Sequence, residues 1–378
     1  MDKKKVLRIT TADISLDRLL KGQLHFLNQF YEVVGVASDT GVLNAVSERE
    51  DIRVVNIPMH REISLWNDLK SLCALYRLFR REKPFIVHAN TPKGSLLSMV
   101  AAWAARIHNR IYLVTGLRYQ GATGIMRVVL KMMERISCIF ATVVIPEGNG
   151  VKKILIEDNI CKNPANVLHH GNINGIDTSF FSSDVIKGSK DEIRRQLGIG
   201  QDDFVFVFIG RIVRDKGMHE LVYAMKRLEE RNVKLLLVGR FEPDMDPLEL
   251  EDDRYLHDSK NVVFVGWQKD VRPFLKAADA LVFPSYREGF PNVPLQAGAM
   301  GLPSIVTDIN GCNEIIIERE NGLIVPSRDS EPLYTKMKWM MENSKEAQRM
   351  GQNARPIIQS RCEQQDVWNA LLSFYNSL

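Results

Sequence analysis

The sequence predicts an α/β protein built from two doubly wound, parallel-sheet domains. Short apolar runs alternate with helix-period segments through most of the 378 residues, a pattern typical of parallel sheets covered by helices. The strand candidates are apolar throughout, as expected for strands that are buried on both faces. The length suits two domains, and a turn-rich segment over 171–190 divides the chain near its middle.

The first half carries the strands and helices expected of an N-terminal domain. Predicted strands lie at 6–9, 32–37, 85–88, 111–114 and 142–145, and predicted helices lie at 64–81 and 93–107. We assign residues 1–172 to this domain, because the cluster of Gly, Asn and Asp over 171–177 indicates a turn.

The second half repeats the alternation over residues 173–363. Its predicted strands lie at 203–210, 234–239, 261–266, 280–284, 304–307 and 322–325, and its predicted helices at 217–231, 270–278 and 293–300. Two such domains joined by a short linker are expected to face each other across a cleft. Ligands of doubly wound sheets bind beyond the carboxyl ends of the strands, so the loops that follow the strands are candidate sites.

Composition excludes several classes of protein. Apolar residues make up 45% and charged residues 25% of the chain, which argues against disorder. No run approaches the roughly 18–20 apolar residues of a membrane-spanning helix. The five cysteines are far apart and lack CxxC spacing, so neither a disulfide framework nor a zinc ribbon is expected. With a basic N-terminus that lacks a signal-peptide core, these features predict a cytoplasmic location.

The charge is distributed unevenly between the two halves. Residues 1–180 hold 24 Lys and Arg against 16 Asp and Glu, a net +8, whereas residues 181–378 hold 26 against 30, a net −4. A basic half indicates an anionic partner, and nucleic acid or an anionic membrane surface would fit. Nucleic-acid binding needs interleaved aromatic and basic residues on one face, which only the segment near residue 77 approaches, so we expect no nucleic-acid partner.

The first motif that could carry chemistry follows the predicted strand 203–210. Arg211 and Lys216 lie five residues apart in a loop bounded by Gly210 and Gly217, just before a predicted helix. Glycine allows close backbone approach, helix N-termini bind anions, and Arg and Lys bind phosphate oxygens. The segment predicts a diphosphate clamp, although a solvated basic turn explains it about as well when it is taken alone. It is not a Walker loop, since GxxxxGK[ST] is absent.

The second motif spans 284–297, between a buried strand and a predicted helix. The carboxylate of Glu288 can accept hydrogen bonds from sugar hydroxyls, and the amides at the helix entry suit a phosphate. Gln296 follows about two helical turns later and is expected to face the same side. Alone, the segment would be an ordinary loop and helix. Beside the first motif, it predicts a second anion-binding loop in the same domain.

These motifs resemble those of the family 4 glycosyltransferases of GT-B fold, especially those that build bacterial capsular and surface polysaccharides. The matching segments in the second half are 210–211 with 216–217, 265–266 before 270–271, 284–297, 301–303, 307–308, Gly311 with Glu314, and 321–322. Those in the first half are 21–23, 88–93 and 116–119, and the linker 174–177 resembles the family's interdomain Asn-Gly-Val-Asp. The resemblance covers nearly the whole chain and is most specific in the second half.

The resemblance implies two Rossmann-like domains, with the segment at about 364–378 packed back on the first. It implies retaining transfer from a nucleotide-diphosphate sugar, with no cofactor and no bound metal. Arg211 and Lys216 would hold the diphosphate and stabilise the leaving nucleotide, and Glu288 would contact the donor, which makes these three the implied catalytic residues. The implied donor-binding residues are Gly22, Gly210, Gly289, Phe290, Pro291, Asn292 and Gln296.

Two positions depart from the family pattern. Gln296 replaces the second Glu of the Glu-x7-Glu motif, usually the ribose ligand, and its amide oxygen can still accept a ribose hydroxyl, so we expect retuned donor binding. Thr115 stands where many members have a His, so the role of that His is not carried over. Residues predicted to line the pocket are His88, Thr115, Arg118 and Tyr119, with packing as the alternative for His88.

Three further features favour ordinary structural roles. Asp244 and Asp246 have the spacing of a DxD metal site, but their surroundings predict an exposed acidic loop. His169 and His170 are expected to point apart in a strand, which does not suit zinc. The helical apolar stripe within 66–79 is expected to pack in the core, with a membrane-surface role as the alternative.

The sequence therefore predicts a cytoplasmic hexosyl- or N-acetylhexosaminyl-transferase that is peripheral to the inner membrane through its basic N-terminal domain. Its expected partners are a nucleotide sugar, with UDP as the nucleotide, and a polyprenyl-diphosphate-linked saccharide of capsule, lipopolysaccharide or exopolysaccharide synthesis. Two alternatives stay open. One is a nucleotide-sugar 2-epimerase of the same fold, and the other is a non-catalytic, donor-binding partner in polysaccharide assembly, supported only by Thr115 and Gln296.

Overall fold

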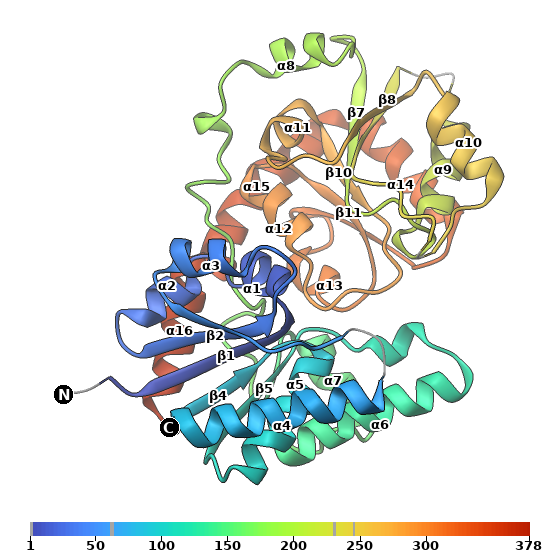
Figure 1. The fold of residues 1–378 in the computed structure, drawn as a ribbon. Helices are drawn as coiled ribbons and strands as arrows, with labels where there is room; N and C mark the ends of the chain where they lie inside the picture. Colours follow the sequence, from blue (N-terminus) through green and yellow to red (C-terminus); the bar gives the residue numbers. More distant parts are fainter. Residues whose placement is uncertain (1–2, 61–63, 230–231, 245) are drawn as a thin grey trace. The chain divides into compact units, whose positions relative to one another are not determined.

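The chain forms two compact units, each with one six-stranded parallel sheet covered by helices on both faces (Figure 1). The computed structural model describes residues 3–60, 64–229, 232–244 and 246–378. Unit 1 comprises Met1–Gly175 with Gln364–Leu378, and unit 2 comprises Ile176–Glu363. The two doubly wound sheets confirm the predicted fold class.

Unit 1 has the strand order β3-β2-β1-β4-β5-β6. Its strands are β1 (Lys5–Ala12), β2 (Glu32–Ser38), β3 (Arg53–Asn56), β4 (Ile86–Ala89), β5 (Asn109–Val114) and β6 (Val143–Pro146). Its helices are α1 (Asp13–Leu19), α2 (Gln23–Asn28), α3 (Leu43–Glu50), α4 (Leu65–Glu82), α5 (Pro92–Ala104), α6 (Gly124–Phe140), α7 (Asn149–Glu157) and α16 (Gln364–Asn376), with a 3-10 turn η1 (Arg118–Gly121).

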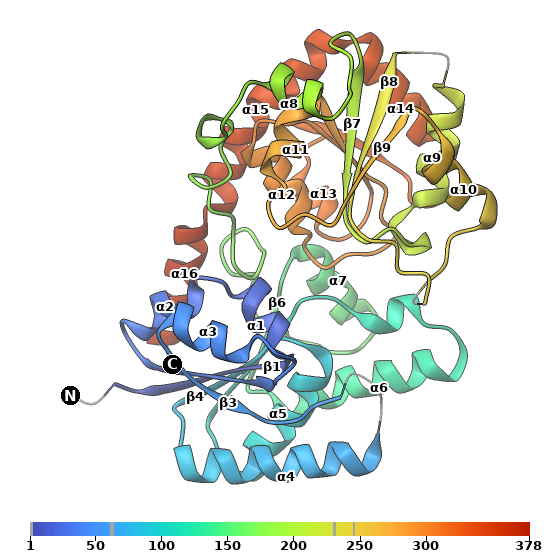
Figure 2. The same cartoon turned by 45° about the horizontal axis from the view of Figure 1, so that its top comes forward.

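The sheet of unit 1 is buried on both faces because its side chains alternate between two cores. In β1, Leu7 and Ile9 pack into one core with residues of α4, α5 and α7. Val6 packs into the opposite core with residues of α1, α2, α3 and α16, and Figure 2 shows these two helical layers. The C-terminal helix α16 therefore completes the first unit rather than the second.

Unit 2 has the strand order β12-β11-β10-β7-β8-β9. Its strands are β7 (Phe204–Ile209), β8 (Val233–Val238), β9 (Val262–Gly266), β10 (Ala280–Phe283), β11 (Ser304–Thr307) and β12 (Gly322–Val325). Its helices are α8 (Lys190–Gln196), α9 (Met218–Arg227), α10 (Leu250–Asp258), α11 (Arg272–Ala277), α12 (Asn292–Ala299), α13 (Cys312–Ile315), α14 (Ser330–Glu342) and α15 (Ser344–Cys362), with 3-10 turns η2 (Ser183–Val185) and η3 (Arg214–Lys216).

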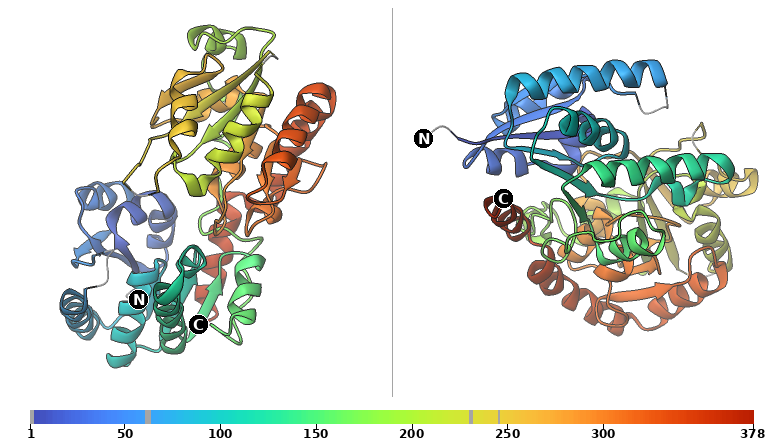
Figure 3. Two further views of the ribbon diagram at one scale, coloured as in Figure 1. Left: turned by 90° about the vertical axis from the view of Figure 1, so that its right-hand side faces the viewer. Right: turned by 90° about the horizontal axis from the view of Figure 1, so that it is seen from below.

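The same alternation builds the cores of unit 2, where helices cover both faces of the sheet (Figure 3). Val205 and Val207 of β7 pack with residues of α11, α12 and α13, whereas Phe206 and Phe208 pack with residues of α9 and α14. Because β7 is apolar on both sides, it occupies an interior position in its sheet, between β10 and β8.

Local signals set several helix ends. Ser189 and Glu192 form a capping box at the start of α8, and Pro92 occupies the first turn of α5. Lys83 ends α4 in the left-handed conformation, with φ of 46°. Among the described residues, every helix is too short or too polar to cross a membrane. The five cysteines, all of them described, are free thiols.

Two expectations about unit 1 are wrong. His169 and His170 lie in a turn instead of a strand, because His169 adopts a left-handed φ of 52°, and their rings meet edge to face with centroids 4.7 Å apart. The apolar stripe within 66–79 is only half in the core. Leu75 and Phe79 are buried, whereas Trp66 is 70% exposed.

Buried Glu134 gives a pH-dependent stability that mutation should remove. It is 3% exposed, and burial raises its pKa from 4.5 to about 7 although the Tyr112 hydroxyl donates to it. Between these pH values the folded state keeps a proton that the unfolded state has lost. The free energy of unfolding therefore falls by about 3 kcal/mol as pH rises through this window. In Glu134→Gln we expect this fall to vanish, measured by urea unfolding at pH 5 and pH 8.

The matched control for this test is Glu157→Gln, which alters an exposed carboxylate of the same unit, paired with Lys153. It should keep the pH slope of the wild type. If the free energy of unfolding had the same pH dependence in wild type and Glu134→Gln, the pKa of Glu134 in the folded state would be that of an ordinary glutamate.

Candidate functional site

The two sequence motifs of unit 2 meet at the point where its sheet changes winding direction. From β7 the chain proceeds outward to β8 and β9, and from β10 it proceeds to β11 and β12 on the other side. The carboxyl ends of β7 and β10 therefore flank the switch point, where doubly wound sheets bind ligands. The loop 210–217 follows β7, and the loop 284–291 follows β10.

Close backbone packing joins these two loops. Gly217 has φ of 74°, and a Cβ at this position would lie 2.1 Å from the carbonyl oxygen of Pro284. The amide of Tyr286 donates to the carbonyl of Asp215 at 2.9 Å. The hydroxyl of Thr307, at the end of β11, donates to the carbonyl of Ser285 at 2.5 Å. Three neighbouring strands thus fix the geometry of the site.

The centre of the site is an ion pair between Lys216 and Glu288, one from each loop. The hydroxyl of Ser285 donates to the same carboxylate oxygen at 2.8 Å, and the Lys216 ammonium lies 5.9 Å from the Phe283 ring centroid. The two charged side chains are 15% and 18% exposed. A largely buried ammonium held by one carboxylate can exchange that partner for a phosphate oxygen, because both are anionic acceptors.

Arg211 lies at the start of the same loop but pairs elsewhere. Its guanidinium is 3.5 Å from a carboxylate oxygen of Glu242, in the segment that follows β8. The approach of these two segments depends on Gly239, since a Cβ there would lie 1.8 Å from the carbonyl oxygen of Gly210. The structure therefore brings Glu288 to Lys216, and it brings Arg211 to the next loop along the sheet.

The N-terminus of α12 contributes backbone donors to the site. Pro291 is the N-cap, and no side chain caps the helix, whose first residue is Asn292. Gly311 allows the preceding turn to pack closely, because a Cβ there would lie 2.5 Å from the carbonyl oxygen of Gly289. Phe290 is 6% exposed and belongs to the core, so its predicted contribution rests on its backbone. Gln296 is partly exposed, farther along α12.

In unit 1, Gly22 and Thr115 have defined structural contacts. Gly22 has φ of 79°, and a Cβ there would lie 2.7 Å from the Trp368 ring of α16. Its amide donates to a carboxylate oxygen of Glu50 at 2.9 Å. Thr115 donates to the carbonyl of Asn90 at 3.1 Å. The predicted roles of Gly22 and Thr115 toward a donor remain predictions.

His88 and Tyr119 lie inside unit 1, and Arg118 is exposed. His88 Nδ1 is 2.6 Å from the Tyr375 hydroxyl, and burial together with nearby Arg8 holds the pKa of His88 well below its ordinary value, so the ring is neutral. Tyr119 donates to Asp158 at 2.6 Å. This arrangement of His88 corresponds to the packing alternative, and its predicted place in a donor pocket remains a prediction.

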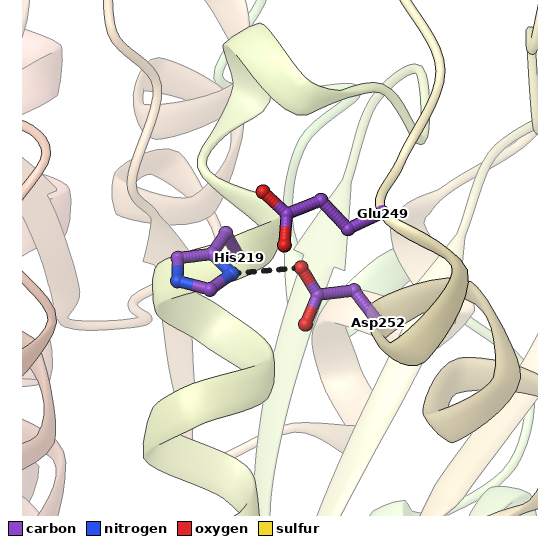
Figure 4. Close-up of side chains that lie close together, drawn as sticks. All are labelled: His219, Glu249 and Asp252. Carbon is purple, nitrogen blue, oxygen red and sulfur yellow. Dashed lines mark hydrogen bonds and ion pairs between the residues drawn. The ribbon is translucent and has the colours of Figure 1, made fainter.

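The carboxylates that could hold a metal are not part of the ion pair between Lys216 and Glu288. Asp246 accepts the amide of Asp215 at 2.8 Å and pairs with Arg214 at 3.1 Å. Within the predicted DxD segment, Met245 lies outside the described residues. A different group of possible metal ligands lies beside α9. Figure 4 shows its three side chains, His219, Glu249 and Asp252, turned toward one another.

In this group the candidate ligand atoms lie within 4.8 Å of one another. His219 Nδ1 lies 2.8 Å from Asp252, and this hydrogen bond raises the pKa of His219. The imidazolium form of His219 is thereby favoured, and a protonated imidazole does not ligate a metal. Two of the three side chains are exposed, and the ion pair accounts for the contact between His219 and Asp252.

Sequence reasoning missed the residues that hold the site residues in place. Ser285 orients Glu288, Arg287 pairs with Asp215 at 2.9 Å, and the Tyr286 hydroxyl donates to Glu220 at 2.8 Å. Ser285 lies in the motif 284–297, three residues before Glu288, and this spacing is the signal that could identify it as a partner of Glu288. Glu220 lies beyond both motifs, and its role follows only from the packing of α9 against the second loop.

Comparison with known proteins identifies similar chains over the full length. The family model for glycosyl transferases group 1 matches residues 189–356, and that for the glycosyl transferase 4-like domain matches residues 25–167. The capsular polysaccharide biosynthesis glycosyltransferase CapM of Staphylococcus aureus is 34% identical over 380 residues, covering 100% of this chain and 98% of CapM.

Two further similarities are more distant. The UDP-Gal:alpha-D-GlcNAc-diphosphoundecaprenol alpha-1,3-galactosyltransferase of Escherichia coli is 29% identical, covering 80% of this chain and 78% of the relative. The crystal structure of Anabaena HepE in complex with UDP has a TM-score of 0.81 and 18% identity, covering 100% of both chains. The second likeness concerns the fold alone.

Proposed function

The chain belongs to the group 1, family 4 glycosyltransferases of GT-B fold, and on this premise we propose a specific reaction for it. The enzyme transfers a hexose or N-acetylhexosamine from a UDP-sugar, with retention of configuration. The acceptor is a saccharide linked to a polyprenyl diphosphate, and the product is used in capsular or other surface-polysaccharide synthesis. The reaction takes place in the cytoplasm, which suits a chain with five free thiols.

The observation that carries this proposal is the ion pair between Lys216 and Glu288 at the switch point of the unit 2 sheet. When the sugar–phosphate bond breaks, negative charge develops on the leaving diphosphate. The Lys216 ammonium, Arg211 and the backbone donors at the N-terminus of α12 stabilise that charge without a metal. Glu288 holds Lys216 in place before the donor binds, and accepts hydroxyl hydrogen bonds from the donor afterwards.

The proposed substrates are supported by the relatives. CapM is named for capsular polysaccharide biosynthesis, and the Escherichia coli relative is named for a UDP-sugar donor and a diphosphoundecaprenol acceptor. In this chain Gln296 takes the place of a carboxylate, so ribose binding relies on a neutral amide oxygen and is weaker.

A donor panel tests the proposal directly. UDP-, GDP- and ADP-sugars are offered to the wild type with and without EDTA, and binding is followed by calorimetry and nucleotide release. We expect tight binding of the UDP class alone, unchanged by EDTA. Turnover should need a lipid-linked saccharide, and the anomeric configuration of the product, read by NMR, should match that of the donor.

Each alternative predicts a different outcome of this panel. Release of free or epimerised sugar without acceptor would indicate the epimerase. Binding without turnover on any acceptor would indicate the non-catalytic partner. Loss of activity with EDTA that His219→Ala reproduces would overturn metal independence and would assign a metal to the cluster beside α9.

A further inference from the structure

We propose that the outer face of α6 in unit 1 is a docking surface for a bilayer that contains anionic phospholipid. Helix α6 is amphipathic, but its apolar side points to solvent. Ile125, Val128, Met132 and Ile139 are 84%, 61%, 58% and 72% exposed. The fully buried residues of this helix are instead Glu134 and Ser137, while Leu130, Cys138 and Phe140 pack partly buried against the core. A soluble helix normally has the opposite arrangement.

The spacing of these residues forms a continuous stripe. At about 100° per residue, positions 125, 128, 129, 132, 136 and 139 fall within an arc of roughly 100°. Glu134 and Ser137 lie on the far side of the helical wheel, where Tyr112 donates to the carboxylate of Glu134. The orientation of α6 is fixed further by Lys131, which pairs with Asp158 at 2.9 Å. The apolar stripe therefore faces outward because polar contacts and the packing of Leu130 and Cys138 hold the opposite side of the helix against the unit.

The charges of α6 are sorted by sign. Arg135 is exposed beside the stripe, whereas the acidic Glu134 is turned into the unit. Helix α4 shows the same sorting. Its exposed cations are Lys70, Arg77, Arg80 and Arg81, while Asp68 pairs with Lys93 and Glu82 pairs with Lys5 and Arg53. The exposed charges on both helices are thus basic, which complements an anionic lipid surface.

Further exposed apolar side chains lie on the helices beside α6. Helix α5 packs against both α4 and α6, and the three form one layer on the sheet of unit 1 (Figures 1 and 2). Trp66 and Leu69 of α4 are 70% and 50% exposed, and Trp103 at the end of α5 is 55% exposed. Tryptophan is enriched at the boundary between lipid and water, where an amphipathic helix sinks its apolar side by about 5–10 Å.

The sorting of charge favours a bilayer over a second copy of the chain as the occupant. In a symmetric contact, the basic flank of this face would oppose itself, and like charges across an interface weaken association. A bilayer offers hydrocarbon to the stripe and phosphates to the flanking Arg and Lys side chains. Binding of this face to a bilayer requires neither a sugar donor nor an acceptor, so the inference does not depend on the proposed reaction.

Vesicle co-sedimentation of the full chain tests the inference. The probes are phosphatidylcholine vesicles and vesicles of phosphatidylcholine with phosphatidylglycerol. Ile125→Ser/Val128→Ser should lower the partition coefficient on the anionic vesicles at least ~10-fold, because two apolar side chains no longer insert. The matched control is Leu250→Ser/Val185→Ser in unit 2, whose side chains are 86% and 56% exposed, and it should bind like the wild type.

Separate variants test the contribution of the basic side chains to vesicle binding. Lys70→Ser/Arg77→Ser should weaken binding to anionic vesicles by about fivefold for each charge removed, and should leave binding to neutral vesicles unchanged. Arg195→Ser/Arg254→Ser, two exposed arginines of unit 2, is the control. Thermal unfolding of every variant checks that it is folded.

Two results would overturn the inference. One is equal vesicle binding by the α6 variant and its unit 2 control. The other is a concentration-dependent dimer, seen by sedimentation velocity, that is lost in the α6 variant while vesicle binding is absent in the wild type. The second result would assign the face to another copy of the chain.

Discussion

Replacing Lys216 by alanine is expected to lower kcat of sugar transfer by about 10²–10³-fold and to leave the protein folded. The ammonium is the cation held by Glu288 at the switch point, and its removal takes positive charge from the position proposed for the leaving diphosphate. Single-turnover transfer from the UDP-sugar measures the chemical step, and calorimetry with UDP separately measures binding. Glu288→Gln keeps the acceptor for Ser285 but loses the charge that positions Lys216, so its activity should fall between wild type and Lys216→Ala.

Lys226→Ala is the matched control, because Lys226 also pairs with a glutamate of unit 2, namely Glu251, but lies on α9 outside the two loops. It should keep kcat and UDP affinity within about twofold, as expected for a surface ion pair. If Lys216→Ala retained the kcat of this control, the diphosphate clamp would be refuted. If it lost kcat but bound UDP normally, Lys216 would act on the transition state alone.

Gly217→Ala is expected to lower the free energy of unfolding by about 3 kcal/mol and to abolish UDP binding. Its φ of 74° disfavours any residue with a Cβ by roughly 1 kcal/mol. The added Cβ would also lie 2.1 Å from the Pro284 carbonyl oxygen, so the two loops must separate. Separation moves Lys216 away from Glu288. Urea unfolding gives the stability, and calorimetry with UDP reports the site.

Gly266→Ala separates the cost of the left-handed backbone conformation from the cost of the close contact between the loops. Gly266 has φ of 70°, but nothing lies within 4 Å of its missing Cβ. Only the backbone cost remains there, so a loss of about 1 kcal/mol is expected. Equal losses in the two variants would mean that the loops tolerate the added methyl group, and that their close approach is not needed for stability.

The elements that carry the motifs could be predicted because their signals are local. The strands at 304–307 and 322–325 have the predicted bounds, since each is a short apolar run between turns. Strand β3 was missed because Arg53-Val-Val-Asn56 is a four-residue edge strand with only two apolar positions. Helix α6 was not singled out either, and the periodicity of its apolar residues equals that of a core-facing helix. The direction in which its stripe points is decided by tertiary contacts such as that of Glu134 with Tyr112.

The sequence could not predict which side chains pair when they are distant in the chain. Both loops of the site were recognised from glycines and charges, but the direct pairing of Lys216 with Glu288, 72 residues apart, depends on the strand order of the sheet. Likewise, Arg8 lies within an apolar run that correctly predicted a strand. Its buried guanidinium needs acceptors, which come from Asn90 and from the hydroxyl of Tyr375.

The return of α16 to unit 1 determines when that unit can finish folding during synthesis. Tyr375 lies 367 residues after Arg8, and all of unit 2 is translated between them. Until α16 leaves the ribosome, the face of β1 and β4 that it covers stays open, and Arg8 and His88 lack their shared hydroxyl partner. Unit 2 is continuous in sequence and can fold first, although it is translated second. Nascent unit 1 is therefore the species that exposes an apolar sheet face longest, and it is the part most in need of chaperone protection.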